Sequence, residues 1–122
     1  MTKRKLYQEA IKEVSDNATL FYVKSKNLIE KGFIRYVVFA TCNNIDDSNR
    51  TIIFGKLVGD RFIPMEGTTE TDADANNFFT TKTHVMRHGE IPCFKCADSA
   101  VGKHLEAYFE GYEVESDEVI TI

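Results

Sequence analysis

The sequence predicts a single α+β domain, with an N-terminal and a C-terminal helix packed on one face of a mainly antiparallel sheet of about five strands. Three observations predict this fold. The chain has 122 residues, close to the commonest size of one domain, and no Pro/Gly-rich linker divides residues 1–122. Apolar residues recur at helical spacing near both ends of the chain. Between them, β-branched and aromatic residues gather in short runs separated by turn signals.

The N-terminal helix is predicted over residues 4–15, because apolar residues three and four positions apart would form one stripe. These apolar residues are Leu6, Ala10, Ile11 and Val14. Polar side chains at 15–17 (Ser, Asp, Asn) would end the helix, since they compete for backbone hydrogen bonds.

Four strands are predicted next, as consecutive antiparallel neighbours, from the β-branched and aromatic content of the sequence. They cover residues 19–26, 33–42, 51–58 and 61–65. The last two form the clearest hairpin, because Gly59 and Asp60 suit a two-residue turn of the II′ kind.

The segment 66–82 is predicted to be a loop followed by a short helix. Asp72 or Asp74 would cap that helix, which would run through Phe78 and Phe79. Residues 80–87 alternate like a strand as readily as they continue a helix, so both alternatives stay open.

The C-terminal helix is predicted to begin at Asp98 or Ser99 and to end at Gly111, which has the position of a helix C′ residue. Its apolar stripe consists of Val101, Leu105, Tyr108 and Phe109. Residues 112–122 would then close the chain as a strand.

Composition points to a cytoplasmic protein without enzymatic activity. Three cysteines are a poor disulfide framework, and no apolar run is long enough for a signal peptide or a membrane span. The sequence contains no glycine-rich phosphate loop, nucleophile elbow or dinucleotide fingerprint, and no nucleophile can be matched with a base. No basic stripe is interleaved with aromatic residues, which disfavours direct nucleic-acid binding.

The charge distribution supplies the first functional hypothesis. The net charge is −4, yet residues 66–122 carry twelve Asp and Glu against four Lys and Arg, whereas residues 1–35 are basic. We therefore expect a small non-catalytic regulator or inhibitor, of the kind that phage and mobile elements encode, whose acidic C-terminal face binds a basic protein surface. The predicted partner-binding residues are Glu106, Glu110, Glu113, Glu115 and Asp117.

The alternative hypothesis is a structural zinc site or a small-ligand site within residues 84–104. The predicted zinc ligands are His84 and His88, spaced for one helix face, with the thiolates of Cys93 and Cys96. An anionic ligand would instead be held by Arg87, Lys95 and Lys103. The competing interpretation is that these cysteines are reduced packing residues. Self-association through an unpaired sheet edge is also open, although no residue of the sequence identifies that edge.

Overall fold

The computed structural model describes residues 4–14, 20–44, 50–71, 77–97 and 104–115, and these ranges contain strands but no helix. Within them, no helix is long and apolar enough to cross a membrane. The strands are β1 (Arg4–Val14), β2 (Leu20–Lys24), β3 (Phe33–Asn44), β4 (Arg50–Val58), β5 (Arg61–Thr71), β6 (Asn77–Phe79), β7 (His84–Arg87), β8 (Glu90–Ala97) and β9 (His104–Glu115).

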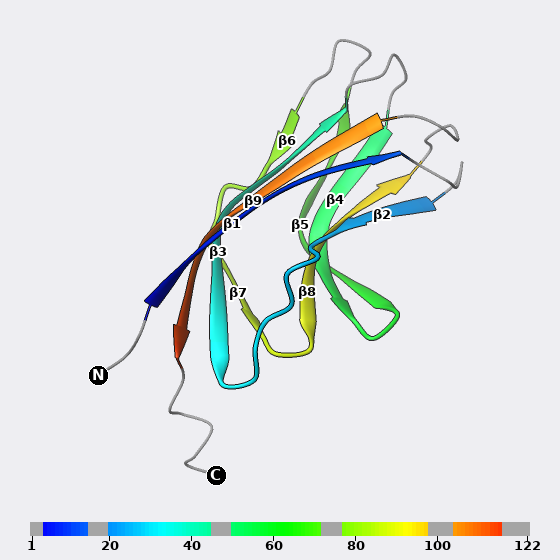
Figure 1. Cartoon of the computed structure of the whole chain (residues 1–122). Coiled ribbons are helices and arrows are strands. Elements are labelled where there is room, and N and C mark those ends of the chain that lie inside the picture. The colour runs from blue at the N-terminus through cyan, green and yellow to red at the C-terminus, as the bar shows by residue number, and fades with distance from the viewer. Residues whose placement is uncertain (1–3, 15–19, 45–49, 72–76, 98–103, 116–122) are drawn as a thin grey trace.

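Two antiparallel sheets face each other (Figure 1). One has the order β1-β9-β3-β6, and β7 also pairs with β3, so that β6 and β7 share one position beside that strand. The other has the order β2-β8-β4-β5. This order, in which the chain crosses repeatedly between the sheets, is that of a jelly-roll sandwich.

The core lies between the sheets and is built by alternate residues of each strand, as the period of a strand requires. Phe94 of β8 is completely buried and stacks on Phe109 of β9 across the sandwich, with ring centroids 5.6 Å apart. It also meets Phe78 of β6, in the opposite sheet, edge-on at 5.9 Å. Aromatic contacts between the two layers therefore hold the sheets together.

The predicted N-terminal helix is wrong, because residues 4–14 form β1. Tyr7 and Ile11 are buried, and their separation of four residues suits one face of a strand as well as one face of a helix. Leu6, which a helix would have buried beside them, is 74% exposed. The deciding interaction is non-local: β1 pairs with β9 along its whole length, through eleven residue pairs.

The predicted C-terminal helix is wrong for the same reason. Residues 104–115 form β9, a central strand between β1 and β3, while 98–103 lie outside the described residues. Leu105, Ala107 and Phe109 alternate as buried residues. Gly111 does not end a helix; a Cβ atom there would collide with the carbonyl oxygen of Tyr36, beside a bulge in β3. Backbone crowding therefore requires this glycine.

The prediction for the middle of the chain is correct in its strands but wrong in their order. Strands β2 and β3 and the β4–β5 hairpin are confirmed, and Gly59 has the positive φ of 66° that its turn needs. However, β2 and β3 lie in opposite sheets. Residues 77–79 form the strand β6 where a helix was predicted, and 72–76 lie outside the described residues. Of the two alternatives for residues 80–87, the structure shows a strand at 84–87.

Candidate interaction surface

The surface of the β1-β9-β3-β6 sheet that points away from the second sheet, called the outer face below, exposes several large apolar side chains. They come from four of its five strands, since alternate residues of each strand point outward. The exposed apolar residues of this face are Leu6, Val38, Phe39, Phe79 and Val85. Large apolar side chains that gather on one exposed face often mark an interaction site.

Aromatic pairs across neighbouring strands fix the shape of the outer face. The rings of Tyr36 on β3 and Tyr112 on β9 stack with centroids 5.0 Å apart and an interplanar angle of 19°. Phe39 on β3 lies 6.5 Å from Phe79 on β6. The guanidinium carbon of Arg4 on β1 lies 4.2 Å from the ring centroid of Tyr112. Packed rings hold few rotamers, so these contacts restrict the shape of the outer face.

Two of the five predicted acidic partner-binding residues, Glu106 and Glu110, lie on the outer face. The carboxylate of Glu106 is 3.7 Å from the Lys12 ammonium, and both side chains are largely exposed. Glu110 accepts a hydrogen bond of 2.8 Å from the Tyr108 hydroxyl, and this bond raises the pKa of Tyr108. Exposed pairs of this type contribute little to stability, so both carboxylates can exchange partners.

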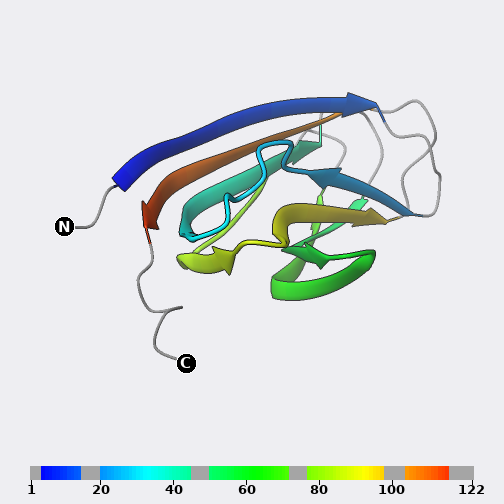
Figure 2. The ribbon, with the colours of Figure 1, turned by 60° about the horizontal axis from the view of Figure 1, so that its bottom comes forward.

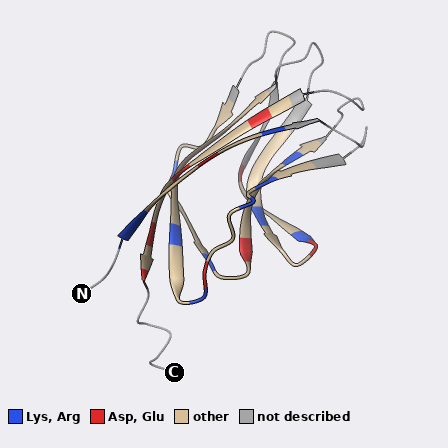
Figure 3. Cartoon of the chain, viewed as in Figure 1, with Lys and Arg blue, Asp and Glu red and all other residues tan. Residues whose placement is uncertain are grey.

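Glu113 and Glu115 lie on the opposite side of β9, so the predicted acidic row is not one surface. Glu113 is buried and forms an ion pair with Arg35, whose Nη2 lies 2.6 Å from Glu113 Oε2. Glu115 is exposed, and Asp117 lies outside the described residues. Acidic and basic residues are interspersed over the strands in Figure 3, because the basic β1 is paired directly with the acidic β9.

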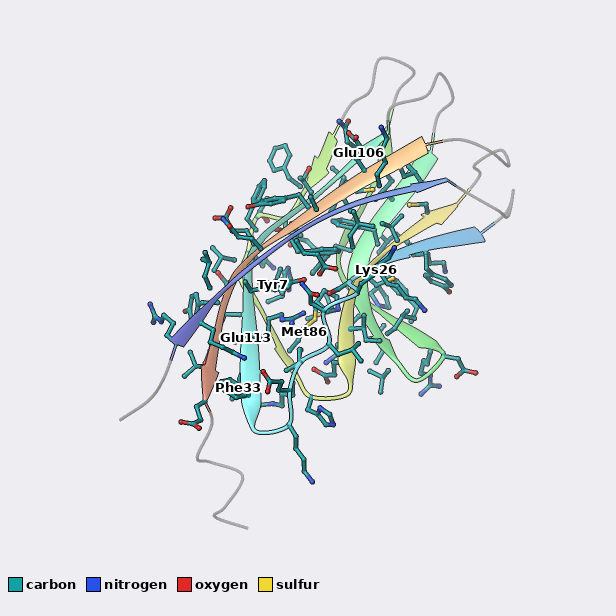
Figure 4. The ribbon with its side chains drawn as sticks, viewed as in Figure 1. Tyr7, Lys26, Phe33, Met86, Glu106 and Glu113 are labelled. Carbon is teal, nitrogen blue, oxygen red and sulfur yellow. The ribbon has the colours of Figure 1, made fainter. Side chains whose placement is uncertain are left out.

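A buried polar cluster lies between β1, β3 and the segment 25–32. Arg35 is only 2% exposed, and its guanidinium carbon lies 3.7 Å from the ring centroid of Tyr7. Glu9 accepts hydrogen bonds from Tyr7 Oη (2.9 Å), Ser25 Oγ (2.5 Å) and the backbone N–H of Lys26 (2.6 Å). Burial raises the pKa of Tyr7. Tyr7 and Glu113, which both contact Arg35, are labelled in Figure 4.

This cluster has a structural role. Ser25 is buried, and its hydroxyl also accepts a hydrogen bond from the Asn27 N–H. A catalytic serine must be accessible to its substrate, and the Ser25 hydroxyl does not meet this condition. The contacts attach the segment 25–32 to β1 and satisfy the charge of Arg35 inside the sandwich.

The predicted zinc ligands point in different directions. Nε2 of the buried His84 lies 2.6 Å from Glu66 Oε2, and its ring packs against Phe54 at 5.0 Å. Nδ1 of His88 instead lies 2.8 Å from the carbonyl oxygen of Ile29. A separation of four residues places two side chains on one helix face, but here a strand and a turn replace that helix.

Cys93 and Cys96 are three residues apart on β8, so their thiols point to opposite faces of that strand. Both are completely buried, and burial raises the pKa of the Cys93 thiol. In the part of the chain that the structure describes, no three metal-binding side chains gather at one point.

The predicted anion-binding residues are not brought together either. Arg87 on β7 pairs opposite Ile34 in one sheet, whereas Lys95 on β8 lies in the other sheet, with its ammonium 5.7 Å from the Phe62 ring centroid. Lys103 lies outside the described residues.

Sequence reasoning missed the aromatic part of the outer face. A signal was present in β9, where acidic and aromatic residues alternate at positions 106, 108, 110 and 112. Read with a period of two, this pattern indicates a strand face that is both aromatic and acidic.

No family model matches the chain, and no curated protein matches it. Among solved structures, the crystal structure of murine APRIL at pH 8.5 is similar, with a TM-score of 0.54 and 10% sequence identity. That match covers 88% of this chain and 99% of the other, and it shows a shared fold alone. Dimeric latent PorU from Porphyromonas gingivalis matches with a TM-score of 0.35 and 9% identity, over 88% of this chain and 13% of PorU.

Proposed function

We propose that this chain is a non-catalytic interaction protein, a small regulator or inhibitor, that binds a protein partner through its outer face. The observation that carries the proposal is the group of large apolar side chains that this face exposes, of which Phe79 is 55% exposed. Water contact with such a surface is unfavourable, and aromatic residues are the commonest energetic anchors of protein interfaces.

The partner that fits this face presents apolar side chains flanked by basic ones. Glu106 and Glu110 supply negative charge beside the aromatic residues, and the exposed Lys12 forms a weak ion pair with Glu106. A basic partner would replace this weak internal pair with an intermolecular one, which favours fast association and selectivity.

A depression in the outer face is a candidate binding site for one side chain of the partner. It has a volume of about 340 Å³ and is lined by small residues such as Ala10 and Thr41 together with Glu106 and Tyr108. Asn43 also lines it, and the side-chain oxygen of Asn43 is a buried acceptor without a hydrogen-bond partner among the described residues.

The proposal places the chain in the cytoplasm. All three cysteines lie in described strands as buried thiols without a disulfide, which suits a reducing compartment.

The test is quantitative capture of partners from an extract of cells that naturally express the chain. We expect the double charge reversal Glu106→Lys/Glu110→Lys to lose the partner that the parent chain captures. Glu115→Lys is the matched control, because it reverses an exposed charge on the other side of the same strand. Capture should also weaken as salt rises, since exposed charge pairs are screened. Equal capture by the double variant and the control would contradict the proposal.

Glu113 must be left unchanged in this experiment. A lysine there would face the buried Arg35, so a loss of binding would report unfolding.

A further inference from the structure

One edge strand differs from the others in length and regularity. The edges of the two sheets are formed by β1, by β6 and β7, by β2, and by β5. Strand β2 has five residues, β6 three and β7 four, while β5 contains Pro64 and shows register shifts against β4. Short strands, prolines and bulges are the usual means of preventing edge-to-edge pairing.

Strand β1 lacks these three features, although it carries charged residues such as Lys5 and Lys12, which also disfavour edge pairing. It has eleven residues, contains no proline, and pairs with β9 without a register shift. Figure 2 shows it at the margin of the molecule, with β9 on its inner side. Alternate residues of an edge strand direct their N–H and C=O groups away from the sheet, so the outer side of β1 can accept another strand.

The segment 25–32 lies beside this edge without pairing with it, and Asn27, Leu28 and Glu30 line an open groove together with residues 5–8 of β1. Its described contacts with β1 run through side chains, as in the Lys5–Glu30 ion pair and the bonds to the Glu9 carboxylate. Among the described residues, backbone hydrogen bonds outside the strand ladders join other segments, not β1.

We propose that β1 pairs antiparallel with β1 of a second copy of this chain, about a two-fold axis at Gln8. In this register, Leu6 of each copy lies opposite Ala10 of the other on the outer face. Among the described residues, Leu6 is the most exposed large apolar residue, at 74%. Each dimer would contain two Leu6–Ala10 pairs, one on each side of the axis, and each pair would shield one Leu6 side chain from water.

Neighbouring registers fit less well. An axis at Glu9 would place the two Glu9 carboxylates against each other and Leu6 against Lys12, and like charges directly opposite each other destabilise a strand pair. An axis at Tyr7 would place Leu6 against Gln8 and shorten the overlap of the described strand.

The proposed register has one electrostatic cost, and that cost makes it testable. Arg4 of each copy would lie opposite Lys12 of the other. Part of this repulsion is offset within each chain, because Lys12 pairs with Glu106 and Arg4 lies over the Tyr112 ring. Salt screens the remainder, so the dimer should tighten as ionic strength rises. Partner binding through Glu106 and Glu110 should instead weaken as ionic strength rises. Because salt acts in opposite directions on the two interactions, each proposal can be tested separately.

Such a dimer would join the two β1-β9-β3-β6 sheets edge to edge and place their outer faces side by side. A partner with two matching sites would then bind with a higher effective concentration at the second site.

The first experiment is cysteine crosslinking of the full chain under mild oxidation. We expect Gln8→Cys to give a disulfide-linked dimer, because the two substituted residues meet at the axis. Lys12→Cys is the matched control on the same strand. Its two copies would lie eight residues of antiparallel strand apart, about 27 Å, too far for a disulfide.

The second experiment is sedimentation equilibrium from about 5 μM to about 1 mM protein, a range that detects a weak strand-paired dimer. We expect Leu6→Lys to weaken dimerisation about tenfold, since both apolar cross-strand pairs are lost. Val58→Lys should have no effect, because Val58 is also an exposed apolar residue, at 40%, but lies in the other sheet beside the turn of the β4–β5 hairpin. A chain that stays monomeric throughout, or a dimer that survives Leu6→Lys and is not crosslinked through Gln8→Cys, would overturn the proposal.

Discussion

Removal of the Glu113 carboxylate should destabilise the sandwich far more than removal of its neighbour Glu115. Glu113 Oε2 receives Arg35 Nε at 2.7 Å and Nη2 at 2.6 Å, and Lys5 Nζ lies 3.5 Å from Glu113 Oε1. The Arg35 side chain is 2% exposed and that of Glu113 is 9% exposed. In Glu113→Ala, the contacts of the guanidinium with described residues would be reduced to a long contact of 3.5 Å to Ser25 Oγ and the face of the Tyr7 ring.

The size of the effect follows from this uncompensated buried charge. Breaking one partner of a buried pair costs about 3–5 kcal/mol. This is a large part of the free energy of unfolding of an ordinary domain, about 5–15 kcal/mol. Urea denaturation followed by circular dichroism should therefore show the midpoint of Glu113→Ala lowered by about 2 M, with an unchanged m-value. Glu115→Ala should lie within about 0.5 kcal/mol of the parent chain, because its side chain is exposed.

A double substitution distinguishes the buried charge from lost packing. Arg35→Met/Glu113→Leu removes both charges while it keeps similar volumes, so it should recover most of the loss and end within about 1 kcal/mol of the parent. Equal midpoints for Glu113→Ala and Glu115→Ala would refute the reasoning. So would a double variant as unstable as Glu113→Ala.

Four further outcomes are expected. Gly111→Ala should destabilise the fold by about 2 kcal/mol or more in the same assay, because its methyl group would meet the Tyr36 carbonyl; a neutral effect would contradict this. The three cysteine thiols, all buried, should react with a thiol reagent only on unfolding, and one fast equivalent in the native protein would count against the structure. Burial alone would raise the pKa of Glu66, but hydrogen bonds from His84 and Thr81 lower it overall below 4.5, so its stabilising contribution should be present above pH 4.5 and lost as pH falls further. Glu66→Gln should remove that part of the acid sensitivity, and an unchanged pH profile would exclude the carboxylate as its source. A chelator should leave the thermal midpoint unchanged, because the four predicted zinc ligands do not converge; a drop would restore the metal hypothesis.

Local signals in the sequence were sufficient where the structure is local. The Gly59 turn, the hairpin around it and the strands before it depend on neighbouring residues, and these predictions are confirmed. The two predicted helices are wrong because the spacing of their apolar residues fits both the 3.6-residue period of a helix and the two-residue period of a strand. Phe109 lies four positions from Leu105, a spacing that suits a helix stripe and one face of a strand alike. What decided between them was the pairing of β1 with β9, about a hundred residues apart in the sequence, which a single sequence does not display.

The same ambiguity shaped the candidate sites. Glu106 and Glu110 were predicted to share one face of a helix. They share one face of β9 instead, because residues separated by an even number of positions point to the same side of a strand. Cys93 and Cys96 are separated by an odd number of residues, so the strand turns one thiol away from the other. The burial of Glu113 could not be foreseen, because its partner Arg35 lies 78 residues away.

Site-specific photocrosslinking tests the role of the outer face most directly, in cells that naturally express the chain. A photoreactive phenylalanine analogue would replace Phe79 on the outer face or, as the control, Ile63 on the β4–β5 hairpin, which is 37% exposed. We expect a single covalent adduct with another protein from position 79, lost in the Glu106→Lys/Glu110→Lys background, and none from position 63. An adduct from position 63 and none from position 79 would show that the chain binds its partner through a different surface.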